Sequence, residues 1–132
     1  MVDWYNGGKK IMPKKILVVD DDKDMVFMIR EMLIKQGYEV LTAGDGTEAL
    51  RLMKTTVPDL MIVDLTMAGM GGWHFTMKVR QDERTKTTPI IVLSGLLERD
   101  SDPEVFESAS AYMVKPFDIF KLMDKVKVLL KA

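Results

Sequence analysis

Apolar residues along the chain fall into two patterns, which predict strands and helices in alternation. Continuously apolar runs of four residues are typical of strands buried on both faces of a parallel sheet. Four such runs are present, at residues 16–19, 60–63, 90–93 and 111–114. A fifth segment, residues 39–43, alternates polar and apolar residues, as a half-exposed edge strand does.

The segments between these strands place apolar residues three or four positions apart, which predicts amphipathic helices. The apolar stripe of the first segment is followed by Gly37, a residue type that favours the end of a helix. Asp102 before Pro103, and Asp118, are residue types that begin helices. The five expected helices occupy residues 23–36, 47–54 (after a turn at residues 45–46), 72–81, 103–108 and the segment after Asp118.

Strand and helix alternate five times, so the pattern predicts an α/β fold with a doubly wound, five-stranded parallel sheet and right-handed crossovers. With 132 residues the chain has room for one such domain, which we expect at residues 14–132. Residues 1–13 contain two adjacent glycines and few large apolar groups. We expect a flexible N-terminal extension there.

Composition removes several classes of function. Hydrophobic residues make up 47% and charged residues 30% of the chain, as in ordinary globular proteins. A formal net charge of −1 offers no surplus of basic groups for nucleic acid. No apolar run approaches the ~20 residues of a membrane span, and the N-terminus lacks the apolar segment of a signal peptide. The absence of cysteine excludes disulfide and thiolate chemistry, and we expect a cytoplasmic protein.

Polar side chains stand at the carboxyl ends of the predicted strands. Asp20 and Asp21 follow the first strand, Asp64 the third, Ser94 the fourth and Lys115 the last. Because these ends lie at one edge of a parallel sheet, the side chains are expected to meet there. Crowded carboxylates raise one another's pKa unless a cation neutralises them, and Mg²⁺ suits a site with few carboxylates. With Mg²⁺ and Lys115 beside it, Asp64 can stay ionised and attack an electrophilic phosphorus.

Motifs around these residues resemble those of the receiver domains of two-component response regulators. They are Ile-Leu-Val-Val-Asp-Asp-Asp at 16–22, Pro-Asp-Leu at 58–60 leading to Asp64, then Met67, Gly72 and Ser94, and Tyr-Met-Val-Lys-Pro-Phe at 112–117. The resemblance covers about residues 14–131. It implies a flavodoxin-like sheet with strand order 2-1-3-4-5 and five helices, as in single-domain chemotaxis response regulators.

The resemblance also implies a role for each acidic residue of the site. Asp64 resembles the phosphoacceptor, which takes a phosphoryl group from the phosphohistidine of a sensor histidine kinase or phosphotransfer protein. Asp20 and Asp21 are similar to the acidic pair that holds Mg²⁺, together with Asp64 and the backbone carbonyl of Thr66. The implied protein is a signalling module rather than an enzyme, with self-catalysed phosphoryl transfer and autodephosphorylation as its only chemistry.

Further residues correspond to the family's phosphoryl-binding and switching groups. Ser94 and Lys115 resemble the hydroxyl and the lysine that bind phosphoryl oxygens, and Ser94 and Tyr112 resemble the pair that switches on phosphorylation. Pro116 is the candidate for a cis peptide bond. The switch implies a downstream protein target.

The outer face of the predicted first helix is the kinase-docking surface that the resemblance implies. It carries Phe27, Arg30 and Ile34, more apolar area than a purely solvated helix needs. Two features depart from the family pattern. Residues 67–72 read Met-Ala-Gly-Met-Gly-Gly instead of Met-Pro-x-Met-Asp-Gly, which is expected to loosen this loop, and the predicted fourth helix is short. Both bear on how phosphorylation is read out.

Two other interpretations stay open at this point. A haloacid-dehalogenase-like phosphohydrolase has its nucleophile in an Asp-x-Asp after the first strand, a spacing that Asp20 and Asp22 share. That family needs Thr or Val where this chain has Asp24, and an acidic cluster where the last strand here ends in Lys115. The second is a receiver-shaped binding module that is never phosphorylated, which the complete set of site residues disfavours. The sequence also leaves open whether the chain is a whole protein or a receiver from a longer one.

Overall fold

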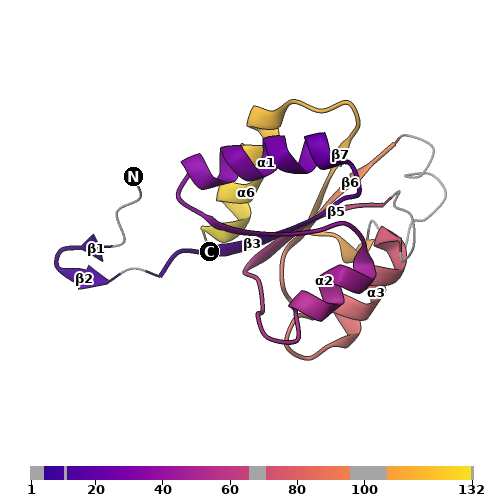
Figure 1. Ribbon diagram of the computed structural model, residues 1–132, viewed down its shortest axis with the longest axis horizontal. Helices are drawn as coiled ribbons and strands as arrows, with labels where there is room; N and C mark the ends of the chain where they lie inside the picture. The colour runs from indigo at the N-terminus through magenta and orange to yellow at the C-terminus, as the bar shows by residue number, and fades with distance from the viewer. Residues whose placement is uncertain (1–4, 11, 66–70, 96–106, 132) are drawn as a thin grey trace.

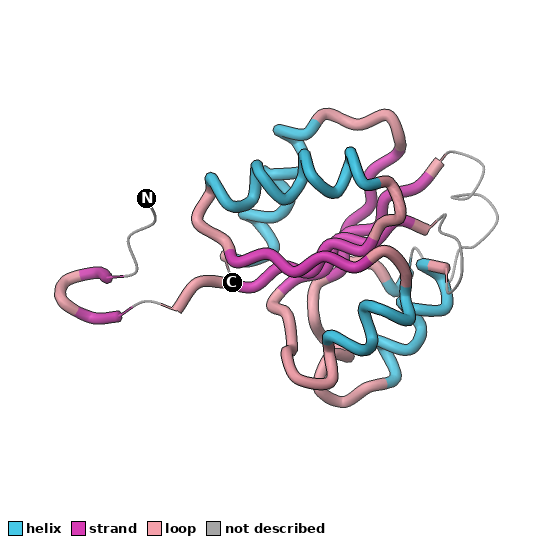
Figure 2. Tube along the Cα trace, in the orientation of Figure 1, coloured by secondary structure: helices cyan, strands magenta, loops and turns pink. Residues whose placement is uncertain are grey.

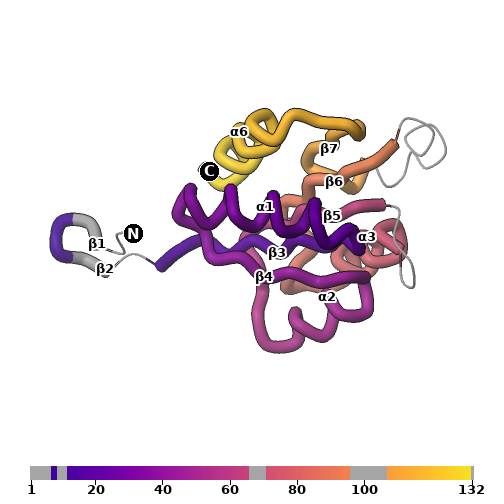
Figure 3. Tube along the Cα trace, turned by 45° about the horizontal axis from the view of Figure 1, so that its top comes forward, coloured from indigo at the N-terminus to yellow at the C-terminus, as the bar shows by residue number. Residues whose placement is uncertain are grey.

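The computed structural model describes residues 5–10, 12–65, 71–95 and 107–131. Its main sheet has five parallel strands. These are β3 (Lys15–Val19), β4 (Glu39–Ala43), β5 (Leu60–Asp64), β6 (Ile90–Ser94) and β7 (Ala111–Val114). They lie side by side in the order β4-β3-β5-β6-β7 (Figure 3). Counted along the chain within this sheet, the order is 2-1-3-4-5, which confirms the predicted flavodoxin-like topology.

Helices cover both faces of the sheet. α1 (Lys23–Lys35) and α6 (Ile119–Leu130) lie on one face, and α2 (Gly46–Leu52) and α3 (Gly72–Gln81) on the other (Figures 1 and 2). The described residues therefore contain four helices with assigned bounds, one fewer than predicted. The remaining predicted helix, at residues 103–108, lies outside the described part of the chain except for its last two residues.

A short hairpin precedes the main sheet. Its strands β1 (Tyr5–Asn6) and β2 (Lys9–Lys10) pair antiparallel, and the turn between them has positive φ at Gly7 and Gly8, where glycine is favoured. The hairpin falls within the N-terminal extension expected at residues 1–13. Among the described residues, no helix is both long and apolar enough to cross a lipid bilayer.

Alternate residues of the strands pack into separate cores on the two faces of the sheet. Ile16 and Val18 of β3 belong to the core under α1 and α6, while Leu17 and Val19 belong to the core under α2 and α3. The helices complete these cores through Ile29, Leu33, Leu122, Met123 and Val126 on the first face and Ala49, Phe75 and Val79 on the second, where Met53, the C-cap of α2, is also buried. Burial on both faces explains why the strands are continuously apolar.

Aspartates begin three of the helices. The side chains of Asp22, Asp45 and Asp118 each accept hydrogen bonds from backbone N–H groups in the first turn. The predicted cap at Asp118 is confirmed. The turn predicted at residues 45–46 is instead the beginning of α2. α2 begins earlier than predicted, at Gly46, because Asp45 is its cap. The predicted cap at Asp102 lies outside the described residues.

Candidate functional site

The carboxyl ends of four strands bring the predicted site residues to one edge of the sheet. Asp20 follows β3, Asp64 and Ser94 end β5 and β6, and Lys115 follows β7. Backbone hydrogen bonds extend the pairing past the strand ends, from Asp20 N to Ala43 O (3.0 Å) and from Lys115 N to Ser94 O (2.7 Å). Asp20 and Asp64 are each only 2% exposed. Ionisable groups buried this deeply at strand ends mark a candidate functional site.

Three carboxylates form the acidic part of the site. Asp20, Asp21 and Asp64 each offer one oxygen, and these atoms lie within 4.8 Å of one another. Asp20 Oδ1 accepts a hydrogen bond from Asp22 N at 3.0 Å, while Asp20 Oδ2 is buried and has no hydrogen-bond partner in the described part of the chain. An unpartnered buried oxygen beside two further carboxylates fits a hard divalent cation with oxygen ligands.

The surroundings of Asp20 also shift the pKa of its carboxyl group. Burial is the main reason that the pKa of its carboxyl is raised to about 6. The backbone N–H of Asp22 and the ammonium of Lys115 lower this pKa, whereas the carboxylate of Asp64 raises it. Negative charge therefore gathers at this edge at a cost that a bound cation would offset.

Lys115 supplies a positive charge directly beside Asp64. Its Nζ lies 3.0 Å from Asp64 Oδ2, and its side chain is 33% exposed, against 3% for that of Asp64. The ammonium neutralises part of the charge of the acidic cluster while keeping contact with solvent. The Lys115–Pro116 peptide bond is cis.

Ser94 and Tyr112 lie along one face of the sheet. Ser94 is fully buried, and its Oγ has no hydrogen-bond partner among the residues described. The β6–β7 register pairs Ser94 with Val114 and Val92 with Tyr112. Residues two apart in a strand share a face, so Tyr112 lies on the same face of the sheet as Ser94. It is two residues before Val114, the last residue of β7. Tyr112 is 36% exposed.

Part of the predicted site lies outside the described residues. Thr66, whose backbone carbonyl the resemblance makes a ligand of Mg²⁺, is in this part of the chain, as are residues 67–70 of the following loop. The described chain resumes at Gly71, which is the N-cap of α3.

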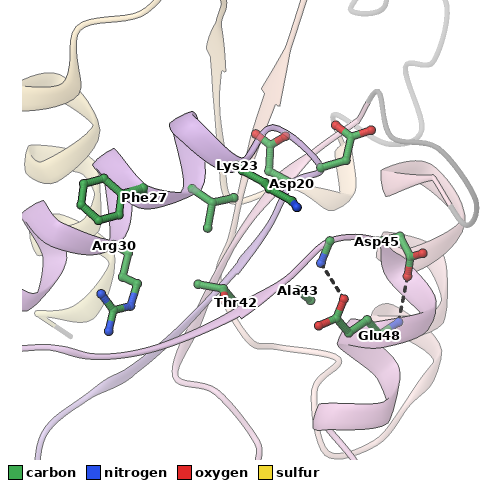
Figure 4. Close-up of a pocket in the computed structure, with 11 residues that line it drawn as sticks. Asp20, Lys23, Phe27, Arg30, Thr42, Ala43, Asp45 and Glu48 are labelled. Carbon is green, nitrogen blue, oxygen red and sulfur yellow. Dashed lines mark hydrogen bonds between the residues drawn. The ribbon is translucent and has the colours of Figure 1, made fainter.

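A hollow of about 540 Å³ opens beside the acidic cluster (Figure 4). α1 forms one side of it, and the end of β4 together with the start of α2 forms the other. Asp20 and Asp21 belong to its lining, and Lys23, Phe27 and Arg30 line it from α1. Phe27 is 63% exposed although it is aromatic. The lining of the hollow therefore combines an exposed aromatic side chain, Phe27, and the cationic side chains of Lys23 and Arg30 with two aspartates of the acidic cluster.

The opposite wall of the hollow is held by the cap of α2. Gly44 N donates to Glu48 Oε2 at 3.0 Å, and Glu48 N donates to Asp45 Oδ1 at 2.9 Å (Figure 4). The sequence does not predict that Asp45 and Glu48 belong to this site, because they lie opposite α1 only as a result of the pairing of β4 with β3. Nor does it predict Lys23, although a spacing of four residues places Lys23 and Phe27 on one helix face.

The chain matches the response regulator receiver domain family over residues 16–127. It belongs to that family. The receiver is therefore a signalling module of two-component, phosphorelay systems, and the match favours this interpretation over a phosphohydrolase.

Curated relatives carry the receiver as one part of a longer chain. The receiver is 33% identical over 121 residues to the "DNA-binding dual master transcriptional regulator RpaA" of Synechocystis. It is 36% identical over 121 residues to the "Alkaline phosphatase synthesis transcriptional regulatory protein PhoP" of Bacillus subtilis. Each alignment covers 91% of this chain and 50% of the relative. The receiver thus spans about half the length of these relatives.

Solved structures of similar sequence have the same fold. The chemotaxis response regulator CheY4 of Vibrio cholerae is 33% identical, with a TM-score of 0.83 covering 90% of this chain and 100% of that one. The response regulator TrrA of Thermotoga maritima, solved in complex with Mg²⁺-BeF, is 37% identical, with a TM-score of 0.79 covering 89% of this chain and 99% of that one. The predicted resemblance and fold are confirmed.

Proposed function

We propose that this receiver accepts a phosphoryl group on Asp64 from the phosphohistidine of a sensor histidine kinase or a phosphotransfer protein. The observation that carries the proposal is the surroundings of Asp64. Its buried carboxylate has oxygens of Asp20 and Asp21 within 4.8 Å and Lys115 Nζ at 3.0 Å. Phosphoryl transfer depends mainly on positioning and on neutralising charge, and these groups supply both.

Asp20, Asp21 and Asp64 would hold Mg²⁺ in this site, with the backbone carbonyl of Thr66 as the further ligand that the family implies. The unpartnered Asp20 Oδ2 and the oxygen-only donor set support this assignment. The structure of the similar protein TrrA in complex with Mg²⁺-BeF supports it as well. When bound, Mg²⁺ neutralises negative charge on the phosphoryl oxygens.

In the transfer, a carboxylate oxygen of Asp64 forms a bond to phosphorus while the bond between phosphorus and the donor imidazole nitrogen breaks. The bonding electrons leave with the imidazole. Lys115 pairs with one phosphoryl oxygen, since its ammonium already lies beside Asp64. Ser94 donates its hydroxyl hydrogen to another, because its Oγ is committed to no partner among the described residues. Water then attacks the phosphorus, the bond between phosphorus and the Asp64 oxygen breaks, and inorganic phosphate leaves as the carboxylate is restored.

Ser94 and Tyr112 form the switch of the proposed mechanism. When Ser94 moves toward the phosphoryl group, space opens on the face of the sheet that it shares with Tyr112. Tyr112 then turns from its exposed position into this space. A downstream protein target that binds only one of the two arrangements reads the phosphorylation state.

We assign the receiver to residues 14–132 and treat residues 1–13 as an extension of it. We place its signalling in the cytoplasm, and its partners are proteins rather than nucleic acid or a membrane. The net charge of −1 supports the choice of protein partners, because no basic surplus is available to neutralise phosphates.

The kinase or phosphotransfer protein would dock on the outer face of α1, beside the hollow. Phe27, Arg30 and Ile34 form this face, and Phe27 is its most exposed apolar side chain. From there the docked protein would reach the acidic cluster, because the same hollow is lined by Phe27 and by Asp20 (Figure 4).

Phe27→Asp is expected to slow phosphotransfer from the cognate kinase by about tenfold or more, because it removes an exposed aromatic anchor and adds a charge. Phosphorylation by acetyl phosphate should stay unchanged. Phe120→Asp is the matched control, since Phe120 on α6 is 66% exposed, against 63% for Phe27. The effect is measured as the rate at which labelled phosphoryl groups move from the phosphorylated kinase to each variant. Equal loss in both variants would contradict docking on α1.

Peptide mapping of the wild-type protein tests the proposed function itself. After treatment with acetyl phosphate and Mg²⁺, we expect one added phosphoryl group, located on Asp64 by mass spectrometry of fragments. A phosphoryl group on another residue would refute the assignment of the acceptor. No incorporation under any donor would favour a receiver-shaped binding module.

A further inference from the structure

Gly72, the first residue of α3, lies against the backbone of the proposed phosphoacceptor. A β-carbon at position 72 would collide with the carbonyl oxygen of Asp64. It would also lie 2.8 Å from Leu65 Cα and 2.9 Å from the carbonyl carbon of Asp64. All three atoms belong to the main chain, so no side chain can turn aside to make room. Only glycine fits with the chain in this position.

Neither partner in this contact is free to move away. On the strand side, Leu65 N donates to Leu93 O at 3.0 Å, which extends the β5–β6 pairing past Asp64. On the helix side, Phe75 is fully buried in the core under α2 and α3, and its N–H donates to Gly71 O at 3.1 Å. The first turn of α3 and the Asp64–Leu65 peptide are therefore each held by other contacts, and they meet at Gly72.

The neighbouring glycine does not share this constraint. Among the described residues, the one atom within 4 Å of a β-carbon at Gly71 would be Leu65 O, at 3.8 Å, which is an ordinary van der Waals distance. Gly71 has φ −71° and ψ 165°, a conformation open to any residue. Of two adjacent glycines, one is required by packing and the other is replaceable.

We propose that Gly72 is a positioning residue of the phosphorylation site. By having no side chain, it lets α3 fix the backbone of Asp64 and Leu65, and with it the direction in which the Asp64 carboxylate faces its partners. The inference rests on the proposed function of Asp64. A side chain at position 72 must displace this backbone, and a misplacement of about 1 Å in a reacting group can cost on the order of a hundredfold in rate.

Gly72→Ala is therefore expected to lower the rate of phosphorylation by acetyl phosphate about ten- to a hundredfold and to weaken Mg²⁺ binding. Gly71→Ala should stay within about twofold of wild type, because its added methyl group makes only an ordinary van der Waals contact with Leu65 O. Val79→Ala is the second control. Val79 is 1% exposed on the same helix, so truncating it costs stability without touching Asp64. Thermal unfolding, the acetyl phosphate rate and Mg²⁺ titration are measured on all four proteins.

A Gly72→Ala protein phosphorylated like wild type would overturn the inference. A loss of rate equal to that of Val79→Ala at equal stability would overturn it too, since the effect would then be one of folding alone. Wild type that accepts no phosphoryl group would instead refute the proposed function.

A second measurement tests the proposal if Gly72→Ala does not fold, or if wild type accepts no phosphoryl group. In it, the backbone amide resonances of the wild-type protein are followed by NMR while Mg²⁺ is titrated in. Those of Leu65 and Gly72 should shift together with that of Asp21. Shifts at Asp21 without shifts at Leu65 and Gly72 would overturn the proposal.

Discussion

Asp64→Asn is expected to lower phosphorylation by acetyl phosphate at least about a hundredfold, because an amide oxygen is a far weaker nucleophile than a carboxylate. Asparagine has nearly the shape of aspartate, so the core around β5 is kept. The substitution also removes one of three crowded carboxylates, which offsets part of the loss of the Lys115 contact. We therefore expect a folded protein whose melting temperature lies within about 5 °C of wild type.

The matched control for this prediction is Asp59→Asn. Asp59 is exposed, precedes the same strand, and accepts a hydrogen bond from Lys15 N at 2.8 Å, at the edge of the sheet away from the site. This variant should be phosphorylated at the wild-type rate. Incorporation is measured from the intact mass after equal times with donor and Mg²⁺. Equal incorporation in Asp64→Asn and wild type would remove Asp64 from the role of acceptor.

Removal of Mg²⁺ with EDTA is expected to slow phosphorylation by about a hundredfold or more, since Lys115 alone would face the charge of three carboxylates and the incoming phosphoryl group. Restoring Mg²⁺ should restore the rate. The affinity for Mg²⁺, measured by calorimetric titration, should fall about tenfold or more in Asp21→Ala, because one carboxylate ligand is lost. An unchanged rate in EDTA would refute the metal assignment.

Asp24→Ala provides the control for Asp21→Ala. Both residues are exposed, and they lie three positions apart, Asp21 before the cap of α1 and Asp24 in the first turn of that helix. Only Asp21 belongs to the acidic cluster. The long-range attraction of Mg²⁺ to negative charge should be nearly the same in the two variants. A comparable loss of affinity in Asp24→Ala would mean that general electrostatics, rather than coordination by Asp21, accounts for the effect.

The sequence predicts the sheet and the edge of the site because strand ends can be located from where apolar runs stop. The stops before Asp20 and after Val114 are enough to bring Asp20 and Lys115 to one edge. A continuous run such as residues 16–19 does not indicate which residues face which core. The structure resolves this by placing Ile16 and Leu17 on opposite faces.

The parts of the site that the sequence does not predict depend on contacts between elements. Ser94 was placed at the edge correctly, but its complete burial follows from the elements packed around it. The family pattern has glycine at position 72 and not at position 71, but the reason, the close approach of α3 to the Asp64 backbone, is visible only in the structure. The roles of Thr66, Ser94 and Tyr112 in binding and switching rest on family resemblance and remain predictions.

Three successive aspartates at the end of β3 have three different surroundings. Asp20 is buried within the site, Asp21 is exposed at its rim, and Asp22 caps α1 through the N–H groups of its first turn. The three residues are chemically identical, yet they are not interchangeable. Deletion of any one of them gives the same shortened sequence, in which aspartates still occupy the first two positions after β3 but Lys23 takes the position of the helix cap. The task of each aspartate thus follows from its position counted from the strand end, and a related sequence should be aligned there by that count rather than by its acidity.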